Sequence, residues 1–296
     1  MKYIEEKLKC YYKTELVNEI LSGMTSKRYT TFRINSLLSN KEEVLKALNN
    51  HKLEVKEVPF YDMAYILCDG NEGDLTALDI YNEGKIYLQS LSSMLPPIVL
   101  DPKESHAILD MAAAPGGKTT EIAALTNNKA QITACELNKI RSERLKYNVS
   151  KQGATSVLVM NTDSRNLDDF FRFDEVLLDA PCSGSGTRSN DEESLKGLTD
   201  VLVNKSINAQ KTMLKNAFKI LKKNGTLVYS TCSIFKCENE DVINSVLPKG
   251  KYQIIPIEVN DVNLETLPST IDGVLTVKPN KYYEGFFIAK IKKIGD

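Results

Sequence analysis

The sequence is poor in the residues that build several common kinds of site. It contains only two histidines, His51 and His106, which argues against a zinc centre. Its six cysteines form no C-x-x-C pair and are too sparse for a disulfide framework, so we expect free thiols in a reducing cytoplasm. No apolar run approaches the ~20 residues of a membrane span, and the charged start, MKYIEEKLKCYYKTEL, lacks the apolar core of a signal peptide. These absences predict a cytoplasmic protein without a metal site or membrane contact.

The sequence also lacks a net charge that would mark a nucleic-acid-binding protein. Lys and Arg total 38 against 39 Asp and Glu, so any basic surface must be local. Residues 196–223 hold seven lysines and one aspartate, and four of the lysines recur at helical spacing: Lys211, Lys215, Lys219 and Lys222. We interpret most of these lysines as the solvated flank of a helix. Residues 1–60, with 11 Lys and Arg against 8 Asp and Glu, are the better candidate for contact with RNA.

Hydrophobic periodicity divides the chain into two parts. Residues 1–73 are expected to form a small α+β unit, with helical spacing at 3–22 and 41–50 and strand-like stretches at 30–35, 53–65 and 66–69. A strand at 86–90 and a connection at 92–100 that contains Pro96 and Pro97 follow. Beyond them, strand patterns (107–111, 131–136, 156–161, 173–179, 225–231, 285–292) alternate with helical ones (117–126, 138–152, 204–222, 238–246). Residues 74–296 are therefore expected to form an α/β domain, a parallel sheet with helices on both faces and ligands at the carboxyl ends of its strands.

The first strand and helix of that alternation meet in the turn of HAILDMAAAPGGK, residues 106–118. Small residues before a helix let backbone N–H groups approach a ligand closely. Gly117-Lys118-Thr119 matches the end of a P-loop, and the strand that ends at Asp179 could bring an acid to magnesium. However, Ala112 stands where a P-loop needs its first glycine, and Pro115 lies inside the loop. A P-loop therefore remains an alternative only.

The second class of ligand is a cofactor with an adenosine end and no phosphates. Such a cofactor needs an acid for its ribose hydroxyls at the tip of the next strand, where Glu136 stands. No G-x-G-x-x-G is present, which disfavours a dinucleotide. We favour the adenosine-type cofactor over the P-loop.

Two cysteines follow the ends of strands that should be neighbours. Cys182 lies in DAPCSGSG, residues 179–186, and Cys232 in STCS, residues 230–233. A single cysteine is often only a small buried hydrophobe. Two of them at ligand-facing strand ends, beside Asp179, favour thiolate attack on an electrophilic carbon. No histidine follows either cysteine, so a protease-type Cys-His dyad is poorly supported.

Taken together, these motifs resemble the RNA cytosine-C5 methyltransferases of the Nop2/Sun (RsmB-like) family. The resemblance rests on the 110–119 turn, Glu136, Asp163, the two cysteine motifs and GFFIAKI at 285–291. Further patches surround Arg33, Gln89, Gln210 and Glu238, so that the match covers nearly the whole chain. One departure is Ala112, where members often carry cysteine. A second is that we see no added RNA-binding domain after the catalytic one.

The resemblance implies a fold, a cofactor and a substrate. The fold is a doubly wound, Rossmann-like class I methyltransferase sheet, preceded by the RNA-contacting unit at 1–73. The cofactor is S-adenosylmethionine (AdoMet), held by Glu136, Asp163, Asp179 and the turn formed by Ala112, Ala113, Ala114, Pro115, Gly116, Gly117 and Lys118. The substrate is cytosine in tRNA or rRNA, single-stranded or flipped out because a paired base is unreachable. We expect a monomer.

The resemblance also implies roles for four side chains. Cys232 is the nucleophile that adds to C6 of the base, and Cys182 assists in product release. Asp179 is placed to stabilise the adduct at the N3/N4 edge. Lys118, beside the cofactor turn, either orients the base, lowers the thiol pKa, or serves as a cation near the cofactor carboxylate.

Two alternatives to these roles stay open. DNA cytosine-C5 methyltransferases use a Pro-Cys nucleophile at the corresponding strand end, which would make Cys182 the attacking residue. An RNA-binding module without catalytic activity is the other. The STCS motif and the N-terminal unit favour an RNA enzyme.

Overall fold

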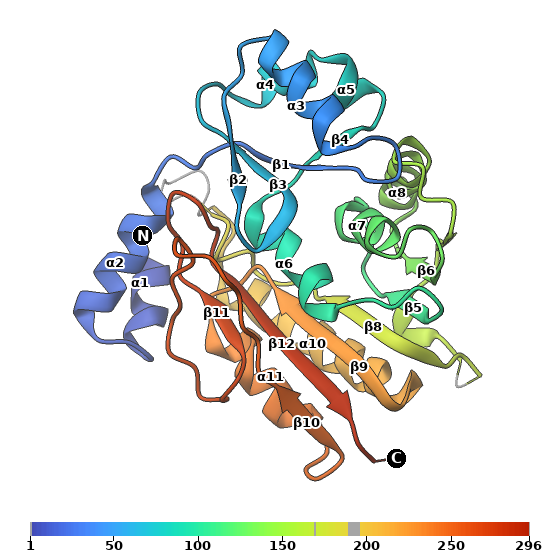
Figure 1. Ribbon diagram of the computed structural model, residues 1–296. Helices are drawn as coiled ribbons and strands as arrows, with labels where there is room; N and C mark the ends of the chain where they lie inside the picture. Colours follow the sequence, from blue (N-terminus) through green and yellow to red (C-terminus); the bar gives the residue numbers. More distant parts are fainter. Residues whose placement is uncertain (1, 169, 189–195, 296) are drawn as a thin grey trace.

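The computed structural model describes residues 2–168, 170–188 and 196–295. Its centre is an eight-stranded sheet in the order β10-β12-β9-β8-β5-β6-β7, with β11 paired to β12 (Figure 1). The strands from β9 to β7 are parallel to one another, and β12 is antiparallel to β9, β10 and β11. Their bounds are β5 (Ala107–Asp110), β6 (Gln131–Cys135), β7 (Val157–Met160), β8 (Phe173–Asp179), β9 (Leu221–Thr231), β10 (Tyr252–Ile255), β11 (Leu275–Val277) and β12 (Phe286–Lys293). The expected α/β class is confirmed.

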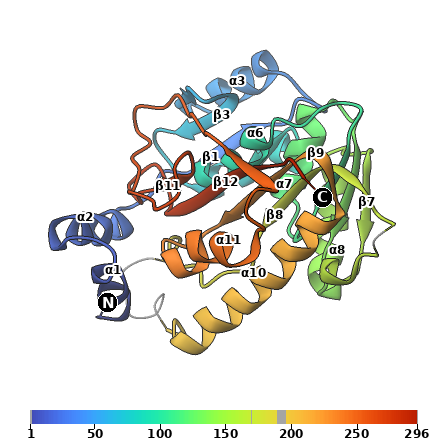
Figure 2. The ribbon, with the colours of Figure 1, turned by 90° about the horizontal axis from the view of Figure 1, so that it is seen from below.

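Helices cover both faces of this sheet, because successive residues of each strand point to opposite sides. On β5, Ile108 packs into one core cluster with α6 (Leu91–Leu100), α7 (Gly117–Leu125) and α8 (Lys139–Lys151). The next residue, Leu109, packs into another with α10 (Asp200–Ile220) and α11 (Glu240–Val246). Figure 2 shows α10 and α11 on one side of the sheet and α6 and α7 on the other. The chain runs from β5 outward to β6 and β7, and later from β8 to β9 on the opposite side. This reversal places a ligand-binding crevice beside β5 and β8.

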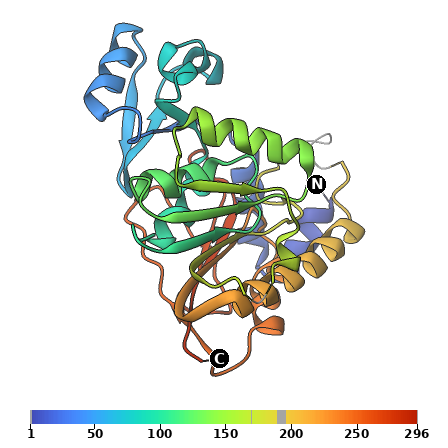
Figure 3. The same cartoon turned by 90° about the vertical axis from the view of Figure 1, so that its right-hand side faces the viewer.

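A smaller antiparallel sheet, in the order β2-β3-β1-β4, projects from the large one (Figure 3). Three helices cover it and share its core. The elements are β1 (Thr31–Ile34), α3 (Lys41–Asn50), β2 (Val55–Val58), β3 (Tyr61–Leu67), α4 (Glu72–Thr76), α5 (Asp79–Asn82) and β4 (Ile86–Leu88). The expected boundary at residue 73 therefore falls inside this unit, whose sheet is completed only by β4.

The first helices of the chain pack elsewhere. The helical spacing at 3–22 becomes two helices, α1 (Lys2–Lys9) and α2 (Thr14–Thr25). Their apolar residues, among them Leu8 and Ile20, share a core cluster with Val203 of α10 and with Phe235. The stretch predicted as one N-terminal α+β unit therefore contributes to two separate core clusters.

The connection over 92–100 is the helix α6, which the proline pair concealed. Ser90 caps its N-terminus by accepting a hydrogen bond from the Ser93 N–H. Pro97 cannot donate to the Ser93 carbonyl, but the Gln89 side chain donates to it instead, at 3.1 Å. Two further short elements are the 3-10 helices η1 (Ser164–Asn166) and η2 (Lys236–Glu238). Within the described residues, no helix combines the length and apolarity needed to cross a membrane.

Candidate active site

Asp110, the last residue of β5, fixes the turn that follows this strand. The Thr119 hydroxyl donates to Asp110 Oδ2 at 2.7 Å, and the Ala112 N–H lies 3.4 Å from Oδ1. Burial raises the pKa of Asp110 to about 6. Gly116 has a φ of 110°, and an added Cβ would lie only 3.0 Å from Leu145 of α8, so this position requires glycine.

The first of two cavities at the strand ends has a volume of about 440 Å³, and we call it the Glu136 cavity. Four of the predicted cofactor residues besides Glu136 line it: Ala112, Ala114, Asp163 and Asp179. Glu136 is buried, and its Oε1 accepts a hydrogen bond from the Asn138 N–H at 2.8 Å. Asp163 forms a two-pronged ion pair with Arg165, which lowers its pKa. The cavity therefore presents three carboxylates.

Arg141, which was not among the predicted site residues, also lines the Glu136 cavity. Its Nη2 donates to the Ala114 carbonyl at 2.8 Å, and its Nη1 lies 3.4 Å from Glu136 Oε2. Arg141 thereby ties the turn to the acid. The sequence carries one clue, because a cation in the first turn of a helix opposes the helix dipole and needs an anionic partner nearby.

The second cavity, of about 310 Å³, is the Lys118 cavity. The predicted residues Ala113, Pro115 and Gly117 line it together with Lys118, whereas Gly116 lines neither cavity. Its other wall comes from residues that the sequence did not identify as site residues: Tyr87, Leu88, Ser90 and Ser93 around β4 and α6, Thr187, and Glu284 and Phe286 at the start of β12. The two cavities share Ala112, Ala114, Asp179 and Cys232.

Lys118 and Asp179 form an ion pair in the wall of the Lys118 cavity. Lys118 Nζ lies 2.8 Å from Asp179 Oδ2 and donates to Ser93 Oγ at 2.7 Å. Asp179 Oδ1 accepts from the Ser230 hydroxyl at 2.7 Å. Burial alone would lower the pKa of Lys118, but Asp179, with smaller effects from Asp110 and Cys232, raises it. Lys118 therefore stays a cation close to Cys232.

Cys182 and Cys232 meet as expected from adjacent strand ends. Asp179 pairs with Ser230 in the β8–β9 register, and the two Sγ atoms lie 3.1 Å apart as free thiols. The hydrogen bond to Cys232, together with burial, raises the pKa of Cys182 well above its usual value. Cys182 therefore keeps its proton and can donate it in a hydrogen bond to the sulfur of Cys232.

Glu238 holds the two cysteine loops together. Its Oε1 accepts from the Ser183 N–H at 2.7 Å, and its Oε2 accepts from the hydroxyls of Ser183 and Ser233, each at 2.6 Å. The Gly186 N–H also donates to the Cys232 carbonyl at 3.0 Å. Because both loops share one buried carboxylate, the spacing of the two sulfurs is set by the fold.

A buried polar network joins the small sheet to the helix that carries Lys118. Arg33 of β1 is fully buried and donates to Gln89 Oε1 at 3.0 Å and to the Thr120 hydroxyl at 2.8 Å. Gln89 donates in turn to Glu121 Oε2 at 2.7 Å, and Arg33 Nε lies 3.9 Å from the same oxygen. Burial raises the pKa of Glu121 to about 8.

This raised pKa predicts a pH dependence of stability. The folded protein holds the Glu121 proton between about pH 4.5 and pH 8, whereas the unfolded chain releases it, so the free energy of unfolding should fall as pH rises through this window. For one proton the slope is at most about 1.4 kcal/mol per pH unit. Glu121→Gln should remove this contribution, so its stability relative to wild type should increase from pH 5 to pH 8 in urea titrations. The exposed Glu143→Gln is the control. Parallel curves for Glu121→Gln and wild type would contradict the assignment.

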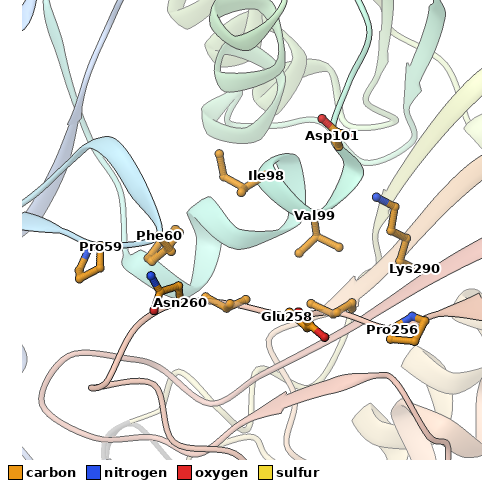
Figure 4. A pocket seen from close by; sticks show the side chains of 11 residues that line it. Pro59, Phe60, Ile98, Val99, Asp101, Pro256, Glu258, Asn260 and Lys290 are labelled. Carbon is orange, nitrogen blue, oxygen red and sulfur yellow. The ribbon is translucent and has the colours of Figure 1, made fainter.

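A third cavity, of about 370 Å³, lies away from these groups (Figure 4). Phe60 from the β2–β3 turn, Ile98 and Val99 of α6, Lys290 of β12 and the 256–260 segment line it. It contains none of the predicted site residues. In the described part of the chain, no group of three or more His, Cys, Asp or Glu side chains is arranged to hold a metal ion.

Comparison with known proteins gives consistent similarities. Residues 97–292 match the family described as 16S rRNA methyltransferase RsmB/F. The chain is 36% identical over 277 residues to ribosomal RNA small subunit methyltransferase F of Shewanella piezotolerans, covering 89% of this chain and 57% of that protein. It is 36% identical over 226 residues to a tRNA (cytosine(72)-C(5))-methyltransferase of Pyrococcus horikoshii, covering 75% and 56%. The crystal structure of PH0851 superposes with a TM-score of 0.87 at 32% identity, covering 98% of this chain and 65% of that one. The chain spans less than two thirds of the length of the two named methyltransferases.

Proposed function

The chain belongs to the RsmB/F family of 16S rRNA methyltransferases, and from this premise we propose that it transfers a methyl group from AdoMet to C5 of a cytosine in RNA. The observation that carries the proposal is the junction of the two cavities, which share Asp179 and Cys232. A cofactor in one cavity and a base in the other would meet at a cysteine and an acid. One relative is named for rRNA and another for tRNA, so the proposal extends to RNA of either kind.

The residues of the Glu136 cavity fit AdoMet. Its three carboxylates, Glu136, Asp163 and Asp179, outnumber its two guanidinium groups, Arg141 and Arg165, so the lining is net negative. Such a lining disfavours a triphosphate, whereas it suits a cationic sulfonium and the hydroxyls of an adenosine ribose. Lys118, which a P-loop would direct at phosphates, instead pairs with Asp179 in the other cavity. When bound, AdoMet supplies the electrophilic methyl group that C5 of the activated base accepts.

Cys232 is the proposed nucleophile. Cytosine C5 is a weak nucleophile, and addition of a thiolate to C6 makes it enamine-like. Lys118 is a cation near this sulfur, and the S–H of Cys182, whose Sγ lies 3.1 Å from that of Cys232, can donate a hydrogen bond to it. Cys182 is the assistant: once C5 carries the methyl group, the C5 proton leaves to water, the C5–H electron pair forms the C5–C6 double bond, and the Cys232 thiolate is expelled next to the S–H of Cys182, which can donate a hydrogen bond to it.

Asp179 and Lys118 are proposed to contact the target cytosine. Asp179 lines the Lys118 cavity and is held in place by Lys118 and Ser230. We assign its carboxyl group to the N3/N4 edge of cytosine, where it stabilises the charge that develops when C6 is attacked. Lys118 lines this cavity and not the other, which favours a role in orienting the base over a role at the cofactor carboxylate.

The small sheet is proposed to contact RNA. Tyr87 and Leu88 of β4 line the Lys118 cavity, so the sheet forms part of the wall around the target base. A chain that starts at Asp74 is a poor test of this role, because it would lack β1, the hydrogen-bonded neighbour of β4, and leave Glu121 without Arg33.

Glu136→Ala should weaken AdoMet binding by about 1–3 kcal/mol, because the ribose hydroxyls would lose their acceptor. Isothermal titration calorimetry on the folded variant measures this loss directly. Glu143→Ala, on the exposed face of α8, is the matched control, since Glu143 pairs with Lys146 at the surface. Unchanged affinity in Glu136→Ala would show that the acid does not bind the cofactor.

A further inference from the structure

Two segments distant in sequence form a basic and aromatic surface. One is the link from α2 to β1, which carries Arg28 and Tyr29, and the other precedes β12 and carries Lys281 and Tyr282. The Tyr29 N–H donates to the Lys281 carbonyl at 3.1 Å. The rings of Tyr29 and Tyr282 stack with their centroids 5.3 Å apart and their planes 26° apart. We call these four residues the Tyr29–Tyr282 surface.

This surface adjoins the mouth of the Lys118 cavity on two sides. Arg28 Nη1 lies 3.5 Å from the carbonyl of Thr187, which lines the cavity. Glu284, two residues after Tyr282, also lines the cavity and accepts a hydrogen bond from Ser90 at 2.8 Å. A base in the cavity would therefore leave its strand at the edge of this surface.

The surface is positively charged. Lys27 and Lys281 are exposed, and within the described residues neither of them nor Arg28 forms an ion pair. Nε and Nη2 of Arg28 are buried and have no hydrogen-bond partner among those residues. Lys281 Nζ lies 5.1 Å from the Tyr282 ring centroid and 6.0 Å from that of Tyr29, so charge and aromatic faces are interleaved.

We propose that the Tyr29–Tyr282 surface binds the nucleotides that flank the target cytosine, with a flanking base on the tyrosine pair and a flanking phosphate on Lys281. The proposal rests on the function proposed above. When cytosine turns into the cavity, its neighbours lose a stacking partner, and an aromatic platform replaces it. Tyr29, 38% exposed, remains accessible to such a base.

Fluorescence anisotropy with a short, labelled oligouridine that contains one central cytidine tests the platform. Tyr29→Ala should raise the Kd for this RNA about tenfold, since stacking is lost. The exposed Tyr147→Ala on α8 is the matched control and should bind like wild type. Calorimetry should give unchanged AdoMet affinity for Tyr29→Ala, which separates a local effect from misfolding. An oligonucleotide that lacks the base next to cytidine, on the side that stacks on the tyrosines, should bind wild type with a Kd raised by a similar factor. Tyr29→Ala should raise the Kd for this abasic RNA little further.

Lys281→Ala tests the phosphate contact through salt dependence. The slope of log K against log salt should become shallower by about 0.7 for one lost phosphate contact to a single strand. Lys249→Ala, on an exposed loop before β10, should leave the slope unchanged.

Suppose that wild type binds and methylates RNA, that Tyr29→Ala has the wild-type Kd and that Lys281→Ala has the wild-type salt dependence. The nucleotide site on the Tyr29–Tyr282 surface is then refuted, and the proposed function stands. If wild type binds AdoMet but neither binds nor methylates RNA, both proposals fall together.

Discussion

The Cys182→Ala protein is expected to remain covalently attached to its RNA. Cys232 can still add to C6 and methylation can proceed, but the step that removes the C5 proton and expels the Cys232 thiolate loses its assistant. Cys232→Ala should form no adduct and transfer no methyl group, because no other described thiol shares both cavities. Cys232→Ala should therefore lose all activity, whereas the reaction of Cys182→Ala should halt after methyl transfer, before the RNA is released.

A denaturing gel separates these outcomes. Each variant is incubated with substrate RNA and AdoMet, and a slow, nuclease-sensitive band should appear with Cys182→Ala alone. Cys10→Ala, an exposed thiol outside the site, should behave like wild type. The reverse pattern, with a band from Cys232→Ala only, would establish Cys182 as the nucleophile, as in DNA cytosine-C5 methyltransferases. No band with either variant would remove the release role of Cys182.

Asp179→Asn is expected to lower kcat by about 10²–10⁴-fold at saturating RNA and AdoMet. The amide cannot carry the charge that pairs with Lys118, nor act as an acid at the base edge. Loss of the carboxylate should also lower the pKa of Lys118, since Asp179 raises it. Asp174→Asn is the matched control, because it lies near the other end of β8 and pairs with Lys222 away from both cavities. Equal kcat values for Asp179→Asn and Asp174→Asn would show that Asp179 takes no part in the reaction.

The strand-end half of the candidate site could be predicted from the sequence because each residue follows a strand of the parallel sheet. Asp110, Glu136, Asp179 and Cys232 all lie at carboxyl ends, which the topology brings to one edge. The turn at 112–118 could be placed for the same reason, since it joins the first of these strands to its helix.

The other wall of the Lys118 cavity could not be predicted, because it depends on long-range packing. Glu284 and Phe286 enter the site only because β12 returns antiparallel to β9, and Leu88 because β4 completes a separate sheet. The residues around Arg33 predicted only a strand. No neighbouring residue in the sequence indicated that Arg33 would be buried against Glu121, 88 residues later. Pro96 and Pro97 hid α6, since the side chain that satisfies the freed carbonyl precedes the helix.

The most direct test of the central claim uses RNA that carries tritium at C5 of cytosine, supplied with AdoMet that carries a ¹⁴C-methyl group. Transfer to C5 must replace the tritium, so wild type should release one tritium into water for each methyl group that enters the RNA. Cys232→Ala should do neither. Methyl incorporation without tritium release would place the methyl group on a nitrogen or a ribose oxygen and contradict the account.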